Sequence, residues 1–553
     1  MKLSMKREAS INLLALFIAL VAFPARAAES RDMVVWGDQG DGTFRNPVLN
    51  ADYPDSDVEK SGDTYYMISS TVFYAPGMAV LQSKDLVNWS LLTHIWPRLS
   101  WETNYDATAM NGYSWGVWAG DLAYNGDRWF CAQIDFQSGL YISSATNIAG
   151  PWSEPHCLLK KKKWTDPALY FDQEKKEAWL LCNFGPPGEG QHEQRLFKLA
   201  WDGSKLLDEG KPIWHGNRSE AAKIHRIDGR WWIFLIDWQP GADGKGNDRR
   251  QLALRSTTDS IYGPYESRVV MQRGNGFTHS ACQGSLLQVP DGSWWFIHQL
   301  IQNGDPIFQG RAQCLQPVTW TNGWPIIGVD VNGDGVGEPV WSARKPITGF
   351  PIVVPQTGDE FSAAKLGPQW EWNHNPRDDR WSLTERPGWL RLKAGQPVNT
   401  GGFWNAANTI SQRHMGTGRG TATARLDLAG VKPGQQAGLC HHSGKFQMIG
   451  VRVAADGKRI LIFNNNGKEQ SGPELTGNEL WLRSEMNADQ TQFAYSLDGA
   501  KWENFGAEFK TTFGHWRGDR IGFYCWNDTT DDVKQSGQLD VDWFHYEFAG
   551  PKK

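Results

Sequence analysis

The stretch DGRWWIFLI at residues 228–236 joins a tight turn to a run of aromatic and aliphatic residues, and it returns as DGSWWFIHQ at 291–299. Asp-Gly is a preferred two-residue hairpin turn, and the run after it is typical of a buried strand. Earlier copies are GDTYYMISS at 62–70, NGDRWFCAQI at 125–134 and the weaker KKEAWLLCN at 175–183. The copies recur roughly 50 to 60 residues apart, a period that predicts five four-stranded blades.

A second repeated element supports the same architecture. SKDLVNW at 83–89 and the segments 144–152 and 256–265, which end in GPW and GPY, each follow a strand-like run. They are interpreted as turns that lead into the outer strands of blades. We therefore predict a five-bladed β-propeller over about residues 40–345.

The chain changes in texture after the propeller. Prolines at 339, 346, 351 and 355 mark a linker, which we place at 346–357. Short alternating strands such as GWLRL at 388–392 follow, separated by turns such as NNG at 465–467. This pattern predicts an antiparallel β-sandwich over residues 358–550. The expected fold class is all-β, since nothing after the amino-terminal segment shows convincing helical periodicity.

Residues 1–27 have the features of a secretory signal peptide. Lys2, Lys6 and Arg7 form a basic start, residues 11–23 are apolar apart from one asparagine, and Ala-Arg-Ala at 25–27 is a small-x-small cleavage pattern. The apolar run is too short to span a membrane, and no cysteine follows it. We expect a soluble protein that is secreted or periplasmic, without membrane insertion.

Composition excludes some classes of partner. The 553 residues carry a net charge of −5, which argues against nucleic acid or anionic membranes, and no protein partner is evident. The 30 tryptophans favour carbohydrate binding, although part of that excess is expected to pack between blades. The seven cysteines are odd in number and have no metal-binding spacing.

Three acidic residues occupy matching positions in the repeats. Asp55, Asp166 and Glu220 each lie roughly 7 to 9 residues ahead of the hairpin turn of their own blade. The inner strands of a propeller line one central funnel, so these side chains are expected to converge. Two carboxyl groups across a glycosidic bond are what sugar hydrolysis requires. Taken singly, each residue could equally well shape a turn or end a strand.

The segments that hold these residues resemble a known family. NPVLNADYPDSDV at 46–58, WTDPALYFD at 164–172 and SEAAKIHRIDGRWWIF at 219–234 are similar to the three catalytic segments of family 43 glycoside hydrolases. DEFSAAKLGPQWEWNHNP at 359–376 resembles the carboxy-terminal concanavalin A-like sandwich of the β-xylosidase and α-L-arabinofuranosidase branch. The resemblance covers nearly all of the mature chain.

The resemblance implies a role for each candidate residue. Asp55 matches the general base, Glu220 the general acid, and Asp166 the carboxylate that tunes and orients the acid. An anionic Asp166 is expected to raise the pKa of Glu220 by like-charge repulsion, so that Glu220 is protonated. The candidate substrate-binding residues are Arg311, Trp118, Phe73 and Gln283. The reaction requires no cofactor.

Two possible ion sites follow from the same resemblance. Many family members have a histidine for an axial ion or water cluster in the segment that reads THSACQGS at 278–285 here, with Cys282 where a related branch has histidine. Whether an ion binds at the axis is left open. Concanavalin A-like sandwiches often hold a structural calcium, for which Asp359, Glu360 and Asp542 are candidate ligands.

The resemblance therefore implies an exo-acting, inverting glycoside hydrolase. It would release terminal β-D-xylosyl or α-L-arabinofuranosyl units, or both, from hemicellulose-derived oligosaccharides. The choice between the two sugars stays open. The alternatives are an endo-acting arabinanase and a propeller that binds sugars without catalysis.

Overall fold

A computed structural model describes residues 36–160, 162–185, 190–240, 247–301 and 307–551. The predicted signal peptide lies outside the described residues. Regular structure in the described chain consists of β-strands and four short 3₁₀ turns, η1 (Thr103–Tyr105), η2 (Asp378–Arg380), η3 (Val398–Thr400) and η4 (Gly402–Asn405). The described residues contain no helix with the length and apolar character of a membrane span.

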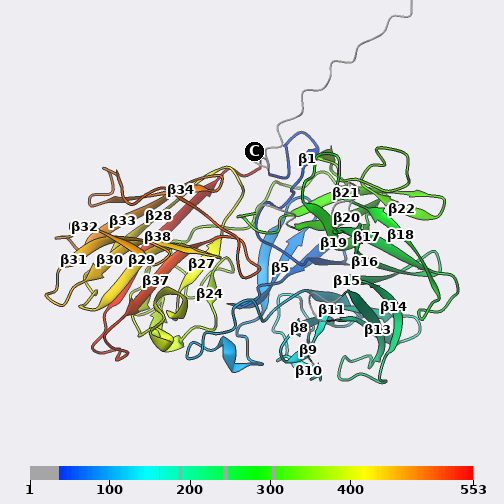
Figure 1. Cartoon of the computed structure of the whole chain (residues 1–553), viewed down its shortest axis with the longest axis horizontal. Helices are drawn as coiled ribbons and strands as arrows, with labels where there is room; N and C mark the ends of the chain where they lie inside the picture. The colour runs from blue at the N-terminus through cyan, green and yellow to red at the C-terminus, as the bar shows by residue number, and fades with distance from the viewer. Residues whose placement is uncertain (1–35, 161, 186–189, 241–246, 302–306, 552–553) are drawn as a thin grey trace, which may run out of the picture. The chain divides into compact units, whose positions relative to one another are not determined.

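The first large body is a five-bladed β-propeller, as the repeats predicted (Figure 1). Its blades are five antiparallel four-stranded sheets. Blade 1 contains β2 (Asp57–Ser61), β3 (Thr64–Ser69), β5 (Gly77–Ser83) and β6 (Ser90–Trp96); blade 2 contains β7 (Gly120–Tyr124), β8 (Trp129–Asp135), β9 (Gly139–Ala145) and β10 (His156–Leu159). Blade 3 contains β11 (Trp164–Asp172), β12 (Glu177–Phe184), β13 (Gln191–Leu199) and β14 (Lys211–Asn217); blade 4 contains β15 (Glu220–Ile227), β16 (Arg230–Pro240), β17 (Asn247–Ser256) and β18 (Tyr265–Met271). Blade 5 contains β19 (Ser280–Gln288), β20 (Trp294–Ile301), β21 (Gln313–Thr321) and β22 (Trp324–Ile327).

The five turn-plus-strand repeats form the hairpin between the first and second strand of each blade. The first strands of successive blades contact one another, so they surround the axis. Tryptophans fill the spaces between blades: the Trp179 and Trp231 rings lie 5.6 Å apart, and those of Trp232 and Trp320 5.3 Å apart. Part of the tryptophan excess is therefore packing, as expected.

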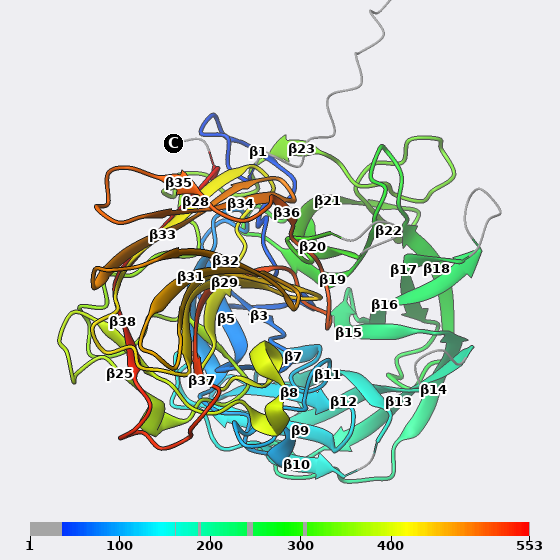
Figure 2. The ribbon, with the colours of Figure 1, turned by 60° about the vertical axis from the view of Figure 1, so that its left-hand side comes forward.

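The second body is a β-sandwich of two sheets (Figure 2). In spatial order, one sheet contains β32 (Lys468–Glu474), β31 (Arg459–Asn465), β30 (Phe446–Val453), β29 (Gln435–His442), β37 (Arg520–Asn527), β27 (Ile410–Arg413), β24 (Glu371–Asn373) and β4 (Tyr74–Ala75). The other contains β25 (Trp381–Ser382), β26 (Leu390–Lys393), β38 (Gln538–Phe548), β28 (Arg419–Asp427), β33 (Glu479–Asn487), β34 (Gln490–Ser496) and β35 (Glu503–Asn504), with β36 (Phe509–Lys510) beside β34. Burial alternates along β28 and β33, which is the pattern of strands with one face in a core.

Backbone pairing and buried charge join the sandwich to the propeller. β4 belongs to the propeller segment of the chain but pairs with β24 of the sandwich. Within the propeller segment, β1 (Thr43–Arg45) pairs with β23 (Ser342–Arg344), which ties the two ends of that segment together. Asp52 forms an ion pair of 2.9 Å with Arg517, and both side chains are fully buried. Breaking such a pair by removing one partner costs about 3–5 kcal/mol. The pair therefore fixes the sandwich loop that precedes β37 against the chain that enters blade 1.

Candidate active site

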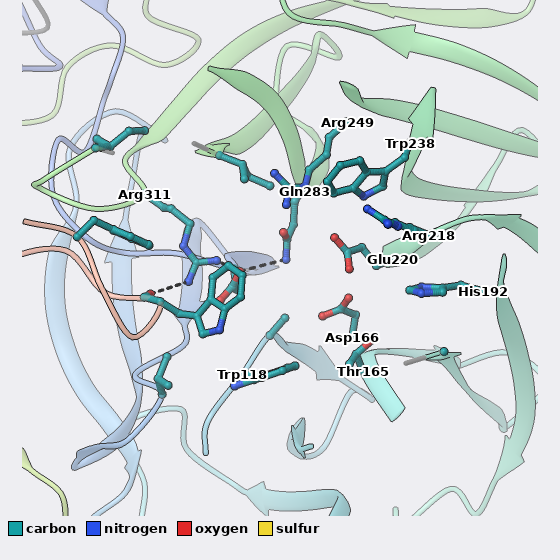
Figure 3. A pocket seen from close by; sticks show the side chains of 18 residues that line it. Trp118, Thr165, Asp166, His192, Arg218, Glu220, Trp238, Arg249, Gln283 and Arg311 are labelled. Atoms are coloured by element: carbon teal, nitrogen blue, oxygen red, sulfur yellow. Dashed lines mark hydrogen bonds and ion pairs between the residues drawn. The ribbon is translucent and has the colours of Figure 1, made fainter. Parts of the chain in front are cut away.

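A pocket of about 430 Å³ lies where the first strands of the blades meet (Figure 3). Its lining comes from all five blades and from the sandwich loop before β37. The side chains at its wall are Asp55, Val72, Trp118, Ala119, Thr165, Asp166, Gly185, His192, Arg218, Glu220, Trp238, Arg249, Gln283, Ile301, Ile307, Arg311, Phe513 and Trp516. The structure thus brings the three predicted carboxyl groups together in one cavity.

Irregularities of the first strands aim the polar side chains at the cavity. β11, β15 and β19 each carry a register shift at the height of the pocket. Asp55, Asp166, Ala221 and Gln283 have φ between 49° and 61°, values that non-glycine residues seldom adopt. β-Bulges re-aim side chains beside active sites, and residues held in such conformations cluster there. The three carboxyl residues, which have matching positions in the sequence repeats, thus lie at or next to residues with left-handed backbone conformation.

Four side-chain donors hold the Asp55 carboxylate. Arg311 Nη1 donates to Oδ1 over 2.6 Å, and Ser70 Oγ donates to Oδ2 over 2.6 Å. The amide groups of Gln283 and Gln299 each donate to Oδ1 over 3.3 Å. This shell fixes the orientation of Asp55 while leaving it at the pocket wall.

Asp166 and Glu220 face each other in the pocket (Figure 3). Burial, followed by the charges of Glu220 and Asp55, raises the pKa of Asp166 to about 8. Burial also raises the pKa of Glu220, although the nearby guanidinium of Arg249 opposes that shift. Two interacting carboxyl groups lose their protons as a pair, so this pair retains a proton near neutral pH. The expectation that an anionic Asp166 raises the pKa of Glu220 is not met: the Glu220 shift comes from burial and from the charge of Asp55, whereas the charge of Glu220 raises the pKa of Asp166.

The predicted substrate-binding residues separate into two groups. Trp118, Gln283 and Arg311 line the pocket. Phe73 does not: it is 1% exposed, and its ring stacks on Tyr74 at 4.4 Å and lies 5.2 Å from that of His374 in the sandwich. The structure contradicts the prediction that Phe73 is a sugar platform, because its aromatic face is used for packing.

The proposed calcium ligands are also not assembled. Glu360 pairs with His545, and Asp542 pairs with Arg425 over 2.7 Å. Asp359 accepts a hydrogen bond of 2.9 Å from the Trp370 indole. Within the described ranges, the one cluster with three suitably close ligand atoms is formed by other residues, His414, His441 and Asp519. The structure therefore does not support this ligand set.

A lysine occupies the axis beneath the carboxyl groups. Lys223 Nζ lies 2.7 Å from Asp121 Oδ1 and 3.1 Å from Asp57 Oδ1. Burial lowers the pKa of Lys223, but the two carboxylates outweigh that effect and keep it above the ordinary value. Ser285 Oγ donates to Asp57 over 2.8 Å. The chain itself thus supplies a cation at the propeller axis.

Sequence patterns missed several wall residues. Arg218 lies in the connection from β14 to β15, Trp238 and Arg249 lie near the ends of β16 and β17, and Phe513 and Trp516 come from the sandwich loop. The motif DWQP at 237–240 was a visible signal, because it extends the blade 4 hairpin beyond its repeat length. Nothing in TFGHWRGD at 512–519 connects it with the propeller until the fold is known.

A pocket with paired carboxyl groups of raised pKa, aromatic walls and arginines is the site of a glycosidase. Residues 44–325 match glycosyl hydrolases family 43, and residues 358–547 match the β-xylosidase C-terminal concanavalin A-like domain. The chain belongs to glycosyl hydrolase family 43, as the catalytic segments indicated. Its sandwich is accordingly of the concanavalin A-like type.

Known relatives align over nearly the whole chain. A β-xylosidase of Formosa agariphila is 48% identical, over 96% of this chain and 95% of that protein. A non-reducing end α-L-arabinofuranosidase of Bacteroides ovatus is 27% identical, over 91% and 94%. A solved family 43 enzyme, engineered to display both endo-xylanase and exo-arabinofuranosidase activity, has a TM-score of 0.77 at 25% identity, over 92% and 100%.

Replacing Lys223 tests the axial cation. Lys223→Met keeps much of the side-chain volume but leaves Asp57 and Asp121 without their cation, so we expect a loss of about 3–5 kcal/mol in the free energy of unfolding at pH 7.5. The loss should shrink at pH 5, where the freed carboxyl groups can be protonated. Urea unfolding at both pH values measures it. Lys84→Met, which removes an exposed ion pair with Asp63, is the control and should cost about 0–1 kcal/mol. Equal costs for the two variants would contradict the assignment.

Asp166→Asn tests the proton held in the pocket. An unfolded aspartate has a pKa of about 3.9, whereas burial and Glu220 raise the pKa of Asp166 to about 8. The folded protein therefore binds the extra proton between these values, and its stability falls as pH rises through them.

The variant lacks this titration. The difference between its melting temperature and that of the wild type should therefore shift in favour of the variant as pH rises from 4.5 to 8. Activity should fall by about 10²-fold or more, and the alkaline limb of kcat/KM should move to lower pH. Differential scanning calorimetry and pH–rate profiles provide both measurements. Asp259→Asn, at an exposed loop position, is the control. An unchanged alkaline limb would show that Asp166 does not share the pocket's proton.

Proposed function

We propose that this protein is an exo-acting, inverting β-xylosidase that removes terminal xylosyl units from xylan-type oligosaccharides. The observation that carries the proposal is the sandwich loop in the pocket wall. Trp516 and Phe513 line the cavity, and the Trp516 carbonyl oxygen accepts a hydrogen bond of 3.1 Å from Arg311 Nη2. A pocket walled on one side in this way fits the end of a chain better than a continuous groove would.

Close backbone packing supports that wall. Asp519 N donates to the Phe308 carbonyl oxygen over 2.7 Å. A Cβ at Gly518 would lie 2.5 Å from the backbone of Gln309, so only glycine allows this approach. The sandwich therefore positions the segment that ends in Arg311, and Arg311 in turn contacts Asp55.

The chemistry proposed for the pocket uses its own side chains. Asp55 would accept a proton from the water that attacks the anomeric carbon, while Glu220 would give its proton to the departing glycosidic oxygen. Asp166, which accepts a hydrogen bond of 3.0 Å from Ala221 N beside Glu220, would keep that proton available. Arg311 would orient both Asp55 and the terminal sugar.

The sugar preference is inferred from the relatives. The 48% identical relative is a β-xylosidase, and the arabinofuranosidase relative is more distant at 27%. β-D-Xylosyl is therefore the first choice and α-L-arabinofuranosyl the second. The signal-like residues 1–27 support action outside the cytoplasm, in the periplasm or the medium.

Product analysis tests exo action and sugar choice together. Digestion of xylohexaose should release xylose from the first time points, with xylopentaose as the paired product, and chromatography detects both. Aryl β-D-xyloside should be hydrolysed at least about tenfold faster in kcat/KM than aryl α-L-arabinofuranoside, a gap of about 1.4 kcal/mol. Early xylotriose without xylose, or release of internal fragments from linear arabinan, would point to endo action instead.

Leaving-group dependence tests the acid and the base separately. Glu220→Gln should reduce cleavage of xylobiose by about 10²–10⁴-fold, but that of dinitrophenyl xyloside far less, because that leaving group departs without a proton. Asp55→Asn should reduce both by similar factors, since either substrate needs an activated water. The measurement is kcat/KM over aryl xylosides of graded leaving-group pKa, with circular dichroism as the folding control. A uniform loss in Glu220→Gln would exclude Glu220 as the acid.

A further inference from the structure

Three arginines surround the carboxyl groups of the pocket. Arg218, Arg249 and Arg311 all line it. Arg311 is paired with Asp55 at 2.6 Å. Arg249 forms no ion pair with any residue that the structure describes, and its Nε is buried without a hydrogen-bond partner. A guanidinium that lines a pocket without an ion pair is expected to bind an acceptor from outside the chain.

Arg249 and Arg218 are held in place by one aromatic ring. Trp238 lies 4.4 Å from the Arg249 guanidinium carbon and 4.9 Å from that of Arg218, measured to the ring centroid. Figure 3 shows the two arginines on either side of this indole, with Glu220 next to them. Arg249 is the cross-strand partner of Trp238 on the β16–β17 ladder, which fixes their spacing. Stacking orders both guanidinium groups before any ligand arrives.

The position of the pair determines which sugar it can reach. Glu220, the proposed acid, must contact the oxygen of the leaving group. Arg218 is two residues before Glu220, and β15, which begins at Glu220, pairs with β16, which carries Trp238. Arg311 instead stands on the side of Asp55. The stacked pair is therefore on the leaving-group side of the scissile bond.

The charge of the pair conflicts with acid catalysis on a neutral substrate. Cations beside a carboxyl group favour its ionised form, whereas a general acid must keep its proton. An anion bound to the guanidinium groups would remove this conflict. We propose that Arg249 and Arg218, stacked on Trp238, form a subsite for an anionic substituent, a carboxylate or a sulfate ester, on the sugar that leaves. The inference rests on the proposed xylosidase function and specifies its substrate class.

Three matched disaccharides test the subsite. In each, β-xylose is joined to the same hexose. This hexose is unmodified in the first, oxidised at C6 to the uronate in the second, and esterified with sulfate in the third. Wild-type enzyme should hydrolyse at least one charged disaccharide about tenfold or more faster in kcat/KM than the neutral one. The better of the two charged substrates identifies which anion the site takes. Equal rates on all three would overturn the subsite and leave the xylosidase function standing.

Variants of the stacked pair connect the preference to these residues. Arg249→Gln should bring the charged-to-neutral ratio of kcat/KM to about 1, whatever its effect on the absolute rates, and Arg249→Lys should keep part of it. Arg268→Gln is the matched control. The Arg268 guanidinium lies 5.1 Å from the Trp324 ring centroid, and neither residue lines the pocket, so this variant should leave the ratio unchanged. A ratio that survives in Arg249→Gln would contradict the assignment.

A binding experiment keeps the two proposals apart. Calorimetry of wild-type enzyme with the free leaving sugars should show at least about tenfold tighter binding of the uronate or the sulfated sugar than of the neutral one. If no disaccharide is hydrolysed, the proposed function fails, and this binding ratio alone decides the subsite. Equal affinities in the titration would overturn it.

The pH profile supplies a readout that a structural role would not change. The charged groups around Glu220 are those that shift its pKa or face it in the pocket: Asp55, Asp166, Arg218, Arg249 and Arg311. An anion on the arginines weakens their lowering of the Glu220 pKa, so the alkaline limb of kcat should lie at higher pH for a charged disaccharide than for the neutral one. Identical limbs for the two substrates would contradict the proposal.

Discussion

The buried ion cluster at the propeller axis is the constraint on which the pocket depends. It connects the first strand of every blade. Asp57 lies on β2, Asp121 on β7, Lys223 on β15 and Ser285 on β19, while Leu169 N on β11 donates to Asp121. Burying two carboxylates is costly unless a cation and hydrogen bonds compensate them. The cluster is therefore complete only when all five blades are in place. Once formed, it holds the first strands together and so fixes the floor of the pocket.

The same strands carry the groups above this floor, and the bulges make that possible. In a regular strand, residues three apart point to opposite faces. Glu220 and Lys223 are three apart on β15, yet one lines the pocket and the other reaches the axis. The register shift between them adds the residue that brings both inward. The positive φ of Ala221 is the local cost of placing an acid and an axial cation on one strand.

The sequence was sufficient for what repeats and local chemistry encode. The hairpin turns gave five blades, and equal distances from those turns identified Asp55, Asp166 and Glu220 as neighbours in space. The prediction that Phe73 binds sugar is wrong because aromatic residues at blade ends serve both packing and sugar binding. Only the burial of the Phe73 side chain, seen in the structure, distinguishes the two roles. Trp516 could not be found, because its place at the pocket follows from how β4 and the Asp52–Arg517 pair seat the sandwich. Lys223 was within a catalytic segment, but its partners lie more than 100 residues away.

The arrangement of charge in the pocket connects stability, acidity and substrate choice. Below the carboxyl groups, the ion pairs of Lys223 with Asp57 and Asp121 keep it charged, and this charge lowers the pKa of Asp166. On the Asp55 side, Arg311 is likewise paired with a carboxylate of the protein. On the Glu220 side, the cation of Arg249 forms no ion pair with a described residue, and it opposes the burial that raises the pKa of Glu220. Because Lys223 and Arg311 are compensated by carboxylates of the protein while Arg249 is not, the pKa of Glu220 depends on what binds beside Arg249. With the proposed subsite, a charged substrate would take part in catalysis, because it would act on the same electrostatics that shift the pKa of Glu220.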